Sequence, residues 1–186
     1  FKLAQALKVR PDYFLHQPAM RVEWLAFRRH SRLSVSEQQR ITAYAERVAE
    51  QQLSLERLFN PNPVATLPHS RFVSTVEDAE QIANEVRQHW RLDDHPFENM
   101  VQFIEDRGAV VVRWRDDSVQ FDGLAGWGNG VTPIVVINMS VPEDRRRFDL
   151  AHELGHLLME GGDLPSKTQE RLAHRFAAAL LVPADA

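Results

Sequence analysis

The pentapeptide His152-Glu153-Leu154-Gly155-His156 limits the fold of this chain more than any other feature. It lies in residues 141–159, where apolar side chains recur at the spacing of an amphipathic helix. On a helix, residues four positions apart share one face, so both imidazoles would point in the same direction. The pattern therefore predicts one helix that carries both histidines at a common site and buries a set of apolar neighbours, namely Ala151, Leu154, Leu157 and Leu158.

This spacing suits a single divalent metal ion. Two histidines on one helix face can bind one Zn²⁺ from the same side. Glu153 lies one position further round the helix, where it can reach a water molecule on the metal rather than the metal itself. Zinc lowers the pKa of that water, and the carboxylate can take its proton as the water attacks a carbonyl group. The alternative is a helix whose two histidines pair with carboxylates and bind no metal.

A third ligand has to come from elsewhere in the chain, because a catalytic zinc ion has three protein ligands and one open position. The chain contains no cysteine, so the ligands must be histidines and carboxylates. Glu170 and His174 share one face of a predicted helix over residues 167–182. We predict that Glu170 is the third ligand and that Glu160 and Asp163 are solvated carboxylates in a turn. His174 is predicted to lie behind the ligands or to assist an oxyanion, and the alternative is an ordinary surface histidine.

Periodicity and turn residues predict the other elements. Ser34, Ser74, Ser140 and Ser166 each begin a capping-box pattern at the start of a helix, and the glycine-rich residues 123–130 predict a loop. The predicted fold class is α+β, in which a small twisted sheet packs on the helix of the histidine pair and on the glutamate helix. This zincin-like arrangement follows an all-α N-terminal segment. The predicted helices cover residues 1–9, 34–59, 74–90, 96–107, 141–159 and 167–182, and the strands cover 109–114, 119–121 and 134–137.

Two motifs in the second half of the chain are specific in combination. They are RRRFDLAHELGHLLME over residues 145–160 and ERLAHRFAAALLVP over residues 170–183. Together with residues 121–127 and 134–138, they resemble the ImmA/IrrE family of zinc metallopeptidases across residues 74–183. The resemblance implies a zinc-dependent peptidase domain with Zn²⁺ as its cofactor.

The resemblance also implies roles for individual residues. The zinc ligands of the family correspond to His152, His156 and Glu170, the same set that the helical spacing predicts. Glu153 would act as general base and then as proton donor to the leaving amine. The family more often has asparagine at the position of His174, and this departure leaves the role of His174 open.

The N-terminal part resembles a different kind of unit. Residues 1–15, FKLAQALKVRPDYFL, resemble the closing helices of a Cro/C1-type (XRE) helix-turn-helix domain, with an ordinary amphipathic helix as the alternative. Residues 27–41, FRRHSRLSVSEQQRI, resemble the connector of such fusions, and we expect the recognition helix upstream of Phe1. The resemblance implies DNA as a partner. Residues 1–60 carry ten Lys and Arg against six Asp and Glu, which fits a neighbour of DNA phosphates and equally a solvated face.

Three prolines in residues 61–68 cannot continue a helix and predict a semi-rigid linker. The charge balance changes at the same place, since residues 61–186 carry twelve Lys and Arg against twenty Asp and Glu. This asymmetry suggests two units with different partners. The predicted division is a remnant of a helix-turn-helix domain over 1–17, a helical connector over 18–60, a proline-rich linker over 61–73 and a zinc metallopeptidase domain over 74–186.

Two functional hypotheses follow. The first is a cytoplasmic zinc-dependent endopeptidase of a DNA-binding regulator, which cleaves a transcriptional repressor in a stress, phage or mobile-element response and can form a homodimer. The second is a helix-turn-helix transcription factor whose peptidase-like domain senses a ligand or metal with little proteolysis. The intact Glu153 favours the enzyme, since a sensor needs no such base. In zinc peptidases of this type the substrate often adds as a strand to a sheet edge, which we expect near residues 128–137.

No apolar run approaches the length of about 18 residues that would span a membrane.

Overall fold

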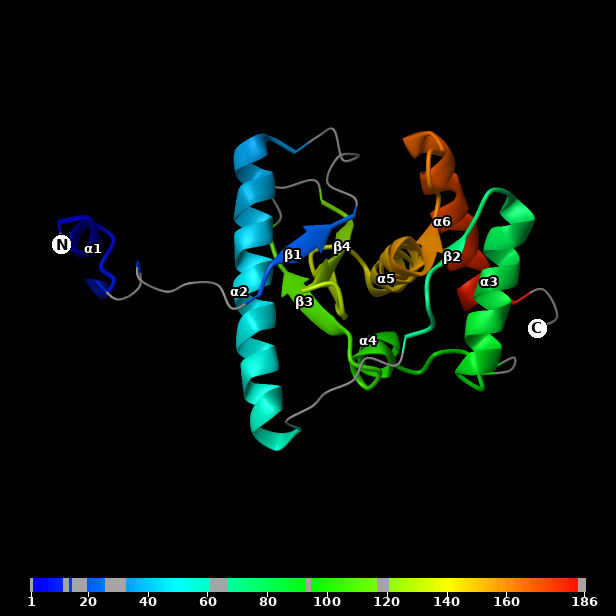
Figure 1. Ribbon diagram of the computed structural model, residues 1–186, viewed down its shortest axis with the longest axis horizontal. Coiled ribbons are helices and arrows are strands. Elements are labelled where there is room, and N and C mark those ends of the chain that lie inside the picture. The colour runs from blue at the N-terminus through cyan, green and yellow to red at the C-terminus, as the bar shows by residue number, and fades with distance from the viewer. Residues whose placement is uncertain are drawn as a thin grey trace.

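The computed structural model describes residues 2–11, 14, 20–25, 33–60, 67–92, 95–116 and 121–183. Within these residues a four-stranded sheet has the long helix α2 (Val35–Phe59) across one face and four further helices on the other side (Figure 1). Helices and strands are mixed along the chain, in agreement with the predicted α+β class. No helix in the described ranges is both long and apolar enough to cross a lipid bilayer.

The strands of the sheet lie in the order β1 (Val22–Trp24), β4 (Gly123–Gly128), β5 (Thr132–Asn138) and β3 (Val110–Trp114). β3 and β5 are parallel, whereas β4 is antiparallel to both of its neighbours, β1 and β5. A turn at Asn129 and Gly130, with φ angles of 50° and 72°, joins β4 to β5. Asparagine and glycine adopt this left-handed conformation at lower cost than other residues, which explains their presence there.

Alternate residues of the two parallel strands face opposite layers. Val112 and Val136 pack in the same cluster as α2, whereas Val111 and Val135 pack with the helices on the other face. Because side chains alternate across a strand, a strand covered on both faces has a continuous run of apolar residues. The α2 face of this core is completed by residues at helical spacing, namely Ile41, Ala45, Ala49 and Leu53.

The helices on the other side are α3 (Val76–His89), α4 (Met100–Glu105), α5 (Glu143–Leu158) and α6 (Ser166–Leu181). α5 packs on β4 and β5, and α6 contacts both α5 and α3 (Figure 1). Gly155 lets α5 and α6 approach closely, since a Cβ atom there would lie 2.9 Å from Cδ1 of the buried Phe176. The remaining elements are α1 (Lys2–Ala6) and a small parallel pair, β2 (Arg71–Phe72) with β6 (Met159–Glu160).

The starts of the helices agree only in part with the predicted capping boxes. The box at Ser34 is present at the start of α2, whereas α3 has its box one residue later than predicted, between Thr75 and Asp78. The boxes at Ser140 and Ser166 are wrong, because α5 and α6 begin directly after Pro142 and Pro165 and have no side-chain cap. Proline occupies the N-cap position of both helices, and it has no side-chain acceptor for the first N–H groups of the helix.

The prediction of an all-α N-terminal segment is wrong. β1 lies within the predicted helical connector and pairs with β4. A strand of three residues is too short to show a period of two in the sequence, and it forms because β4 offers it an edge. The domain boundaries stay a prediction. Parts of the predicted remnant (1, 12–13, 15–17), connector (18–19, 26–32) and linker (61–66) lie outside the described residues.

The glycine-rich residues 123–130 form β4 and its turn rather than the predicted loop. Glycine is uncommon in strands because it contributes no side-chain packing, but close approach of another backbone requires it. At Gly126 a Cβ atom would lie 2.7 Å from the backbone oxygen of Glu23 on β1.

Of the strand predicted over 119–121, the first two residues lie outside the described residues and the third is not in a strand. The sheet edge predicted near 128–137 is also wrong, because β5 is paired on both sides.

Candidate metal centre

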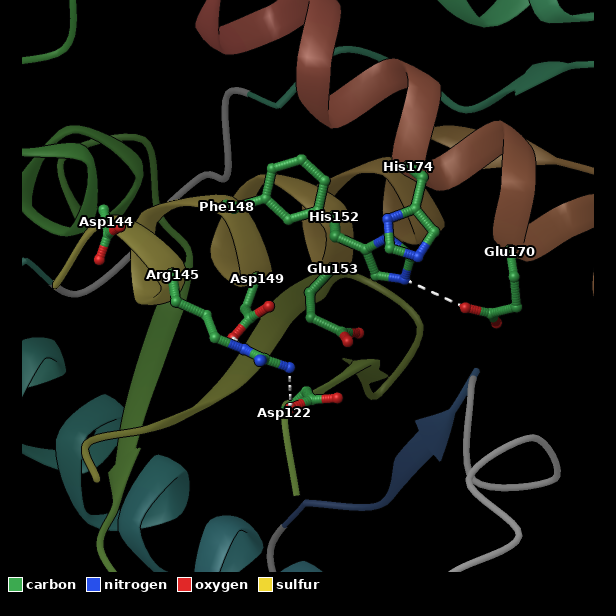
Figure 2. Close-up of a pocket in the computed structure, with 9 residues that line it drawn as sticks. All are labelled: Asp122, Asp144, Arg145, Phe148, Asp149, His152, Glu153, Glu170 and His174. Atoms are coloured by element: carbon green, nitrogen blue, oxygen red, sulfur yellow. Dashed lines mark hydrogen bonds and ion pairs between the residues drawn. The ribbon is translucent and has the colours of Figure 1, made fainter. Parts of the chain in front are cut away.

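Two packed helices bring the predicted ligands together. α5 carries His152 and His156, and Glu170 lies near the start of α6 and points toward His152 (Figure 2). His152 Nε2 lies 3.1 Å from His156 Nε2 and 3.2 Å from Glu170 Oε2, and His156 Nε2 lies 3.4 Å from Glu170 Oε1. The two histidine side chains are about one-tenth exposed and that of Glu170 is 27% exposed. The cluster is therefore mostly buried but reachable from solvent.

The donor set and its spacing suit a zinc ion. In a tetrahedral site with zinc–ligand distances of about 2.0–2.1 Å, neighbouring ligand atoms lie about 3.3–3.4 Å apart. The three separations measured here are within a few tenths of an ångström of that value. Two imidazoles and a carboxylate also form one of the ligand sets of catalytic zinc, with a fourth position left for water or substrate. The cluster could therefore hold one metal ion.

Electrostatics make Glu170 a suitable ligand. Burial raises the pKa of its carboxyl group, but the hydrogen bonds and electrostatic interactions with His152 and His156 outweigh burial and hold the pKa far below its usual range. Glu170 is therefore an anion in the folded chain, as a metal ligand has to be. Of the rival carboxylates, Glu160 is exposed and accepts a hydrogen bond from a serine hydroxyl, and Asp163 is exposed in the turn before α6.

Glu153 lies beside the cluster and is only 1% exposed. Glu153 fits there because residue 123, at the start of β4, is a glycine. A Cβ atom on Gly123 would lie 2.8 Å from Glu153 Cγ and 3.0 Å from its Oε1. Figure 2 shows the Glu153 carboxylate next to His152, in the wall of a cavity of about 400 Å³ that Glu170 also lines. A carboxylate held in this position can act on a water molecule at the centre.

His174 lies against the cluster without belonging to it. Its ring centroid is 4.5 Å from that of His152, and the ring stacks on Phe148 at 5.5 Å (Figure 2). Burial, together with the charge of His152, lowers the pKa of His174. The residue lines the same cavity as Glu153, so it can reach a molecule bound there. Its role in support of an oxyanion stays a prediction.

Sequence reasoning assigned no role at the centre to four charged residues that line the cavity, namely Asp122, Asp144, Arg145 and Asp149. The Arg145 guanidinium lies 2.9 Å from Asp122 Oδ1 and 3.7 Å from Asp149 Oδ2. Burial and the charge of Asp122 raise the pKa of Asp149 to about 6, although Arg145 opposes the change. Asp149 is four residues before Glu153 on α5, and this spacing is a signal that could have revealed it. No pattern links Asp122 to the site, because it reaches the cavity from the start of β4.

Replacing Asp149 by asparagine is expected to make stability less dependent on pH. Because the folded chain favours the protonated form, the stabilising contribution of Asp149 is fully present below about pH 4 and is lost as the pH rises through about 6. The wild type should therefore lose stability relative to Asp149→Asn mainly between about pH 4 and pH 6. Thermal unfolding of both proteins at saturating zinc measures this difference, with the exposed Asp163→Asn as control. Equal pH dependence in wild type and Asp149→Asn would contradict the raised pKa.

The fold and the cluster together define a class of protein. An α+β domain with two histidines and a glutamate on packed helices, and a buried glutamate beside them, is typical of zinc peptidases. Residues 104–186 match the family model of the M78 peptidases, described as an IrrE N-terminal-like domain. The match includes both α5 and α6, supports the resemblance to the ImmA/IrrE family and indicates a metallopeptidase-like function. A comparison with curated proteins finds no match. The helix-turn-helix tail lies outside the matched residues and stays a prediction.

Proposed function

We propose that this chain is a zinc-dependent endopeptidase and that its substrate is a transcriptional repressor. The observation that carries the proposal is the convergence of His152, His156 and Glu170 next to the buried Glu153. The match of residues 104–186 to a peptidase family supports the same chemistry. Endopeptidase activity requires both a bound metal ion and an adjacent base, and the cluster with Glu153 can supply both.

The mechanism assigns a task to each group in the cavity. His152, His156 and Glu170 would hold a zinc ion, which supplies Lewis-acid chemistry by polarising a peptide carbonyl and making water more acidic. Glu153 accepts the proton of the attacking water on a carboxylate oxygen and passes it to the nitrogen of the leaving amine. Its burial beside the start of β4 keeps this carboxylate in one position, so that little reorganisation accompanies the proton transfer. His174, whose ring lies against that of His152, would donate an N–H hydrogen bond to the oxygen that becomes negative.

The regulatory part of the proposal concerns the N-terminal half. A helix-turn-helix domain preceding the peptidase would bind DNA, and the basic balance of residues 1–60 supports this arrangement. Such domains commonly bind two half-sites as dimers, so we propose a homodimer that acts in the cytoplasm, where DNA and repressor are both present. Cleavage of the repressor would then belong to a stress, phage or mobile-element response.

Metal content and cleavage, measured on the same preparation, test this proposal. The purified chain is expected to hold about one zinc ion and to cleave a repressor encoded next to its own gene. Removal of the metal with 1,10-phenanthroline should stop the cleavage, and added zinc should restore it. Bound zinc without cleavage of any neighbouring repressor or of a peptide mixture, both in the wild type and in a variant whose β1 strand is released from β4, would contradict the endopeptidase. That result would favour the alternative, a transcription factor whose peptidase-like domain senses a ligand or metal.

A further inference from the structure

The outer edge of β4 is already occupied by the chain itself. β1 runs antiparallel along β4, with Trp24 opposite Gly126. Beyond the strand, the Leu25 N–H donates a hydrogen bond of 2.9 Å to the Ala125 carbonyl. An extended peptide that adds to a sheet edge uses the same backbone groups. β1 therefore takes the hydrogen bonds that β4 would otherwise offer to a substrate.

β1 also points toward the candidate metal centre. β4 begins at Gly123, next to Glu153, and because β1 is antiparallel its C-terminal end lies toward that end of β4. Leu25 lines a cavity of about 480 Å³ together with His156 and Trp127. A peptide that added antiparallel to β4 would follow the path of β1 and approach Glu153 from the same direction.

Glycine residues on β4 allow β1 to lie unusually close to it. A Cβ atom at Gly126 would lie 2.7 Å from the backbone oxygen of Glu23, and one at Gly128 would lie 2.6 Å from Met20 Sδ. A side chain at Gly126 would push the backbone of β1 away, whereas one at Gly128 would require the Met20 side chain to move. β1 lies outside residues 104–186, the part that matches the peptidase family, so the covering strand comes from another part of the chain.

We infer that β1 occupies the place of the substrate backbone on β4 and keeps the peptidase in an autoinhibited state. This inference rests on the proposed peptidase function. A substrate segment has to displace Arg21–Leu25 before its scissile bond can reach Glu153. A side-chain hydrogen bond also attaches β1 to α2: the Trp24 indole Nε1 donates to Glu46 Oε1 at 3.1 Å. A signal that shifts α2 would therefore also loosen β1.

The first test compares Leu25→Pro with Leu25→Ala in the full zinc-loaded chain. Proline removes the N–H that bonds to the Ala125 carbonyl, whereas alanine keeps that N–H and only shortens the side chain. Leu25→Pro is expected to cleave fluorescent casein about tenfold or more faster than the wild type, and Leu25→Ala at close to the wild-type rate. Adding Glu153→Gln to Leu25→Pro should abolish the gain, which ties the activity to this centre.

A second pair of variants keeps the test decisive if Leu25→Pro does not fold. Glu46→Ala removes the acceptor for the Trp24 N–H, whereas Glu46→Gln keeps an acceptor oxygen. Only Glu46→Ala is expected to raise the rate. A free peptide with the sequence of residues 20–25, MRVEWL, should inhibit whichever variant is activated, because it can fill the vacated edge. A scrambled peptide of the same composition is the control.

The outcomes separate this inference from the function on which it rests. Equal rates in wild type and variants, with hydrogen exchange showing the β4 amides exposed in Leu25→Pro or Glu46→Ala, would overturn autoinhibition and leave the peptidase intact. Lower rates in both variants would show that β1 helps to build the site, and would overturn the inference in the same way. Absence of cleavage in every zinc-loaded variant with an open β4 edge would overturn the proposed peptidase and the inference together.

Discussion

Replacing Glu153 by glutamine is expected to lower kcat for peptide cleavage by about 10²- to 10⁴-fold, with zinc content and folding unchanged. Glutamine has nearly the same shape as glutamate, so it fits the buried space beside Gly123. Its amide cannot accept the proton of the attacking water, and the reaction loses its general base. Cleavage assays on wild type and variant at equal zinc loading measure the loss.

A glutamate on the same helix provides the control for this variant. Glu143 lies in the first turn of α5 and is exposed, so Glu143→Gln should keep full activity. Cleavage at the wild-type rate by Glu153→Gln would show that another group serves as the base. Equal loss in both variants would instead point to damage to α5, and it would contradict the specific role of Glu153.

Replacing His156 by alanine is expected to lower zinc affinity by more than about 100-fold, because even partners that only orient the ligands cost about 10- to 100-fold when removed. The same change should uncouple stability from zinc. At a zinc concentration of about 100 times its Kd, the wild type gains about 2.7 kcal/mol in free energy of unfolding, and the variant should gain far less. Competition with a coloured chelator measures affinity, and denaturant unfolding with and without zinc measures stability.

The control for the histidine variant is His89→Ala, since His89 is exposed at the end of α3. It should keep the zinc-dependent gain in stability. Glu170→Ala should behave like His156→Ala, because the two residues belong to the same cluster. Wild-type zinc affinity in either ligand variant would show that the ion binds elsewhere and that the ligand assignment is wrong.

The histidine pair and its helix could be predicted because the signals are local. The spacing of four residues, the apolar neighbours and the carboxylate at Glu153 all lie within a few turns of one helix. Helix α2 was predictable for the same reason, with its capping serine and its periodic apolar face. In both cases the signal comes from residues close together in the sequence, and the helix seen in the structure agrees with it.

The sequence could identify Glu170 as a candidate ligand, but it could not predict that Glu170 lies next to the two histidines. Its spacing from His174 places both on one face of α6, but their distance from the histidine pair depends on how α6 packs on α5. That packing relies on Gly155, which admits the ring of Phe176. A pattern along one helix contains no information about the angle or separation of two helices, which side-chain shapes at the contact determine.

β1 and β4 show most clearly what the sequence pattern could not reveal. A three-residue strand and a glycine-rich strand have no hydrophobic period; β1 forms because β4 offers it hydrogen bonds and space, and β4 forms because it also pairs with β5 along its whole length. Asp122 and Asp149 likewise meet at Arg145 only because β4 starts beside α5. The amino-acid order alone predicted the candidate ligands, the candidate base and the long helices, since these depend on residues a few positions apart. The tertiary structure alone decided which strand covers β4 and which charges surround the centre, because those contacts join residues about 20 to 100 positions apart whose pairing follows from shape and hydrogen bonding.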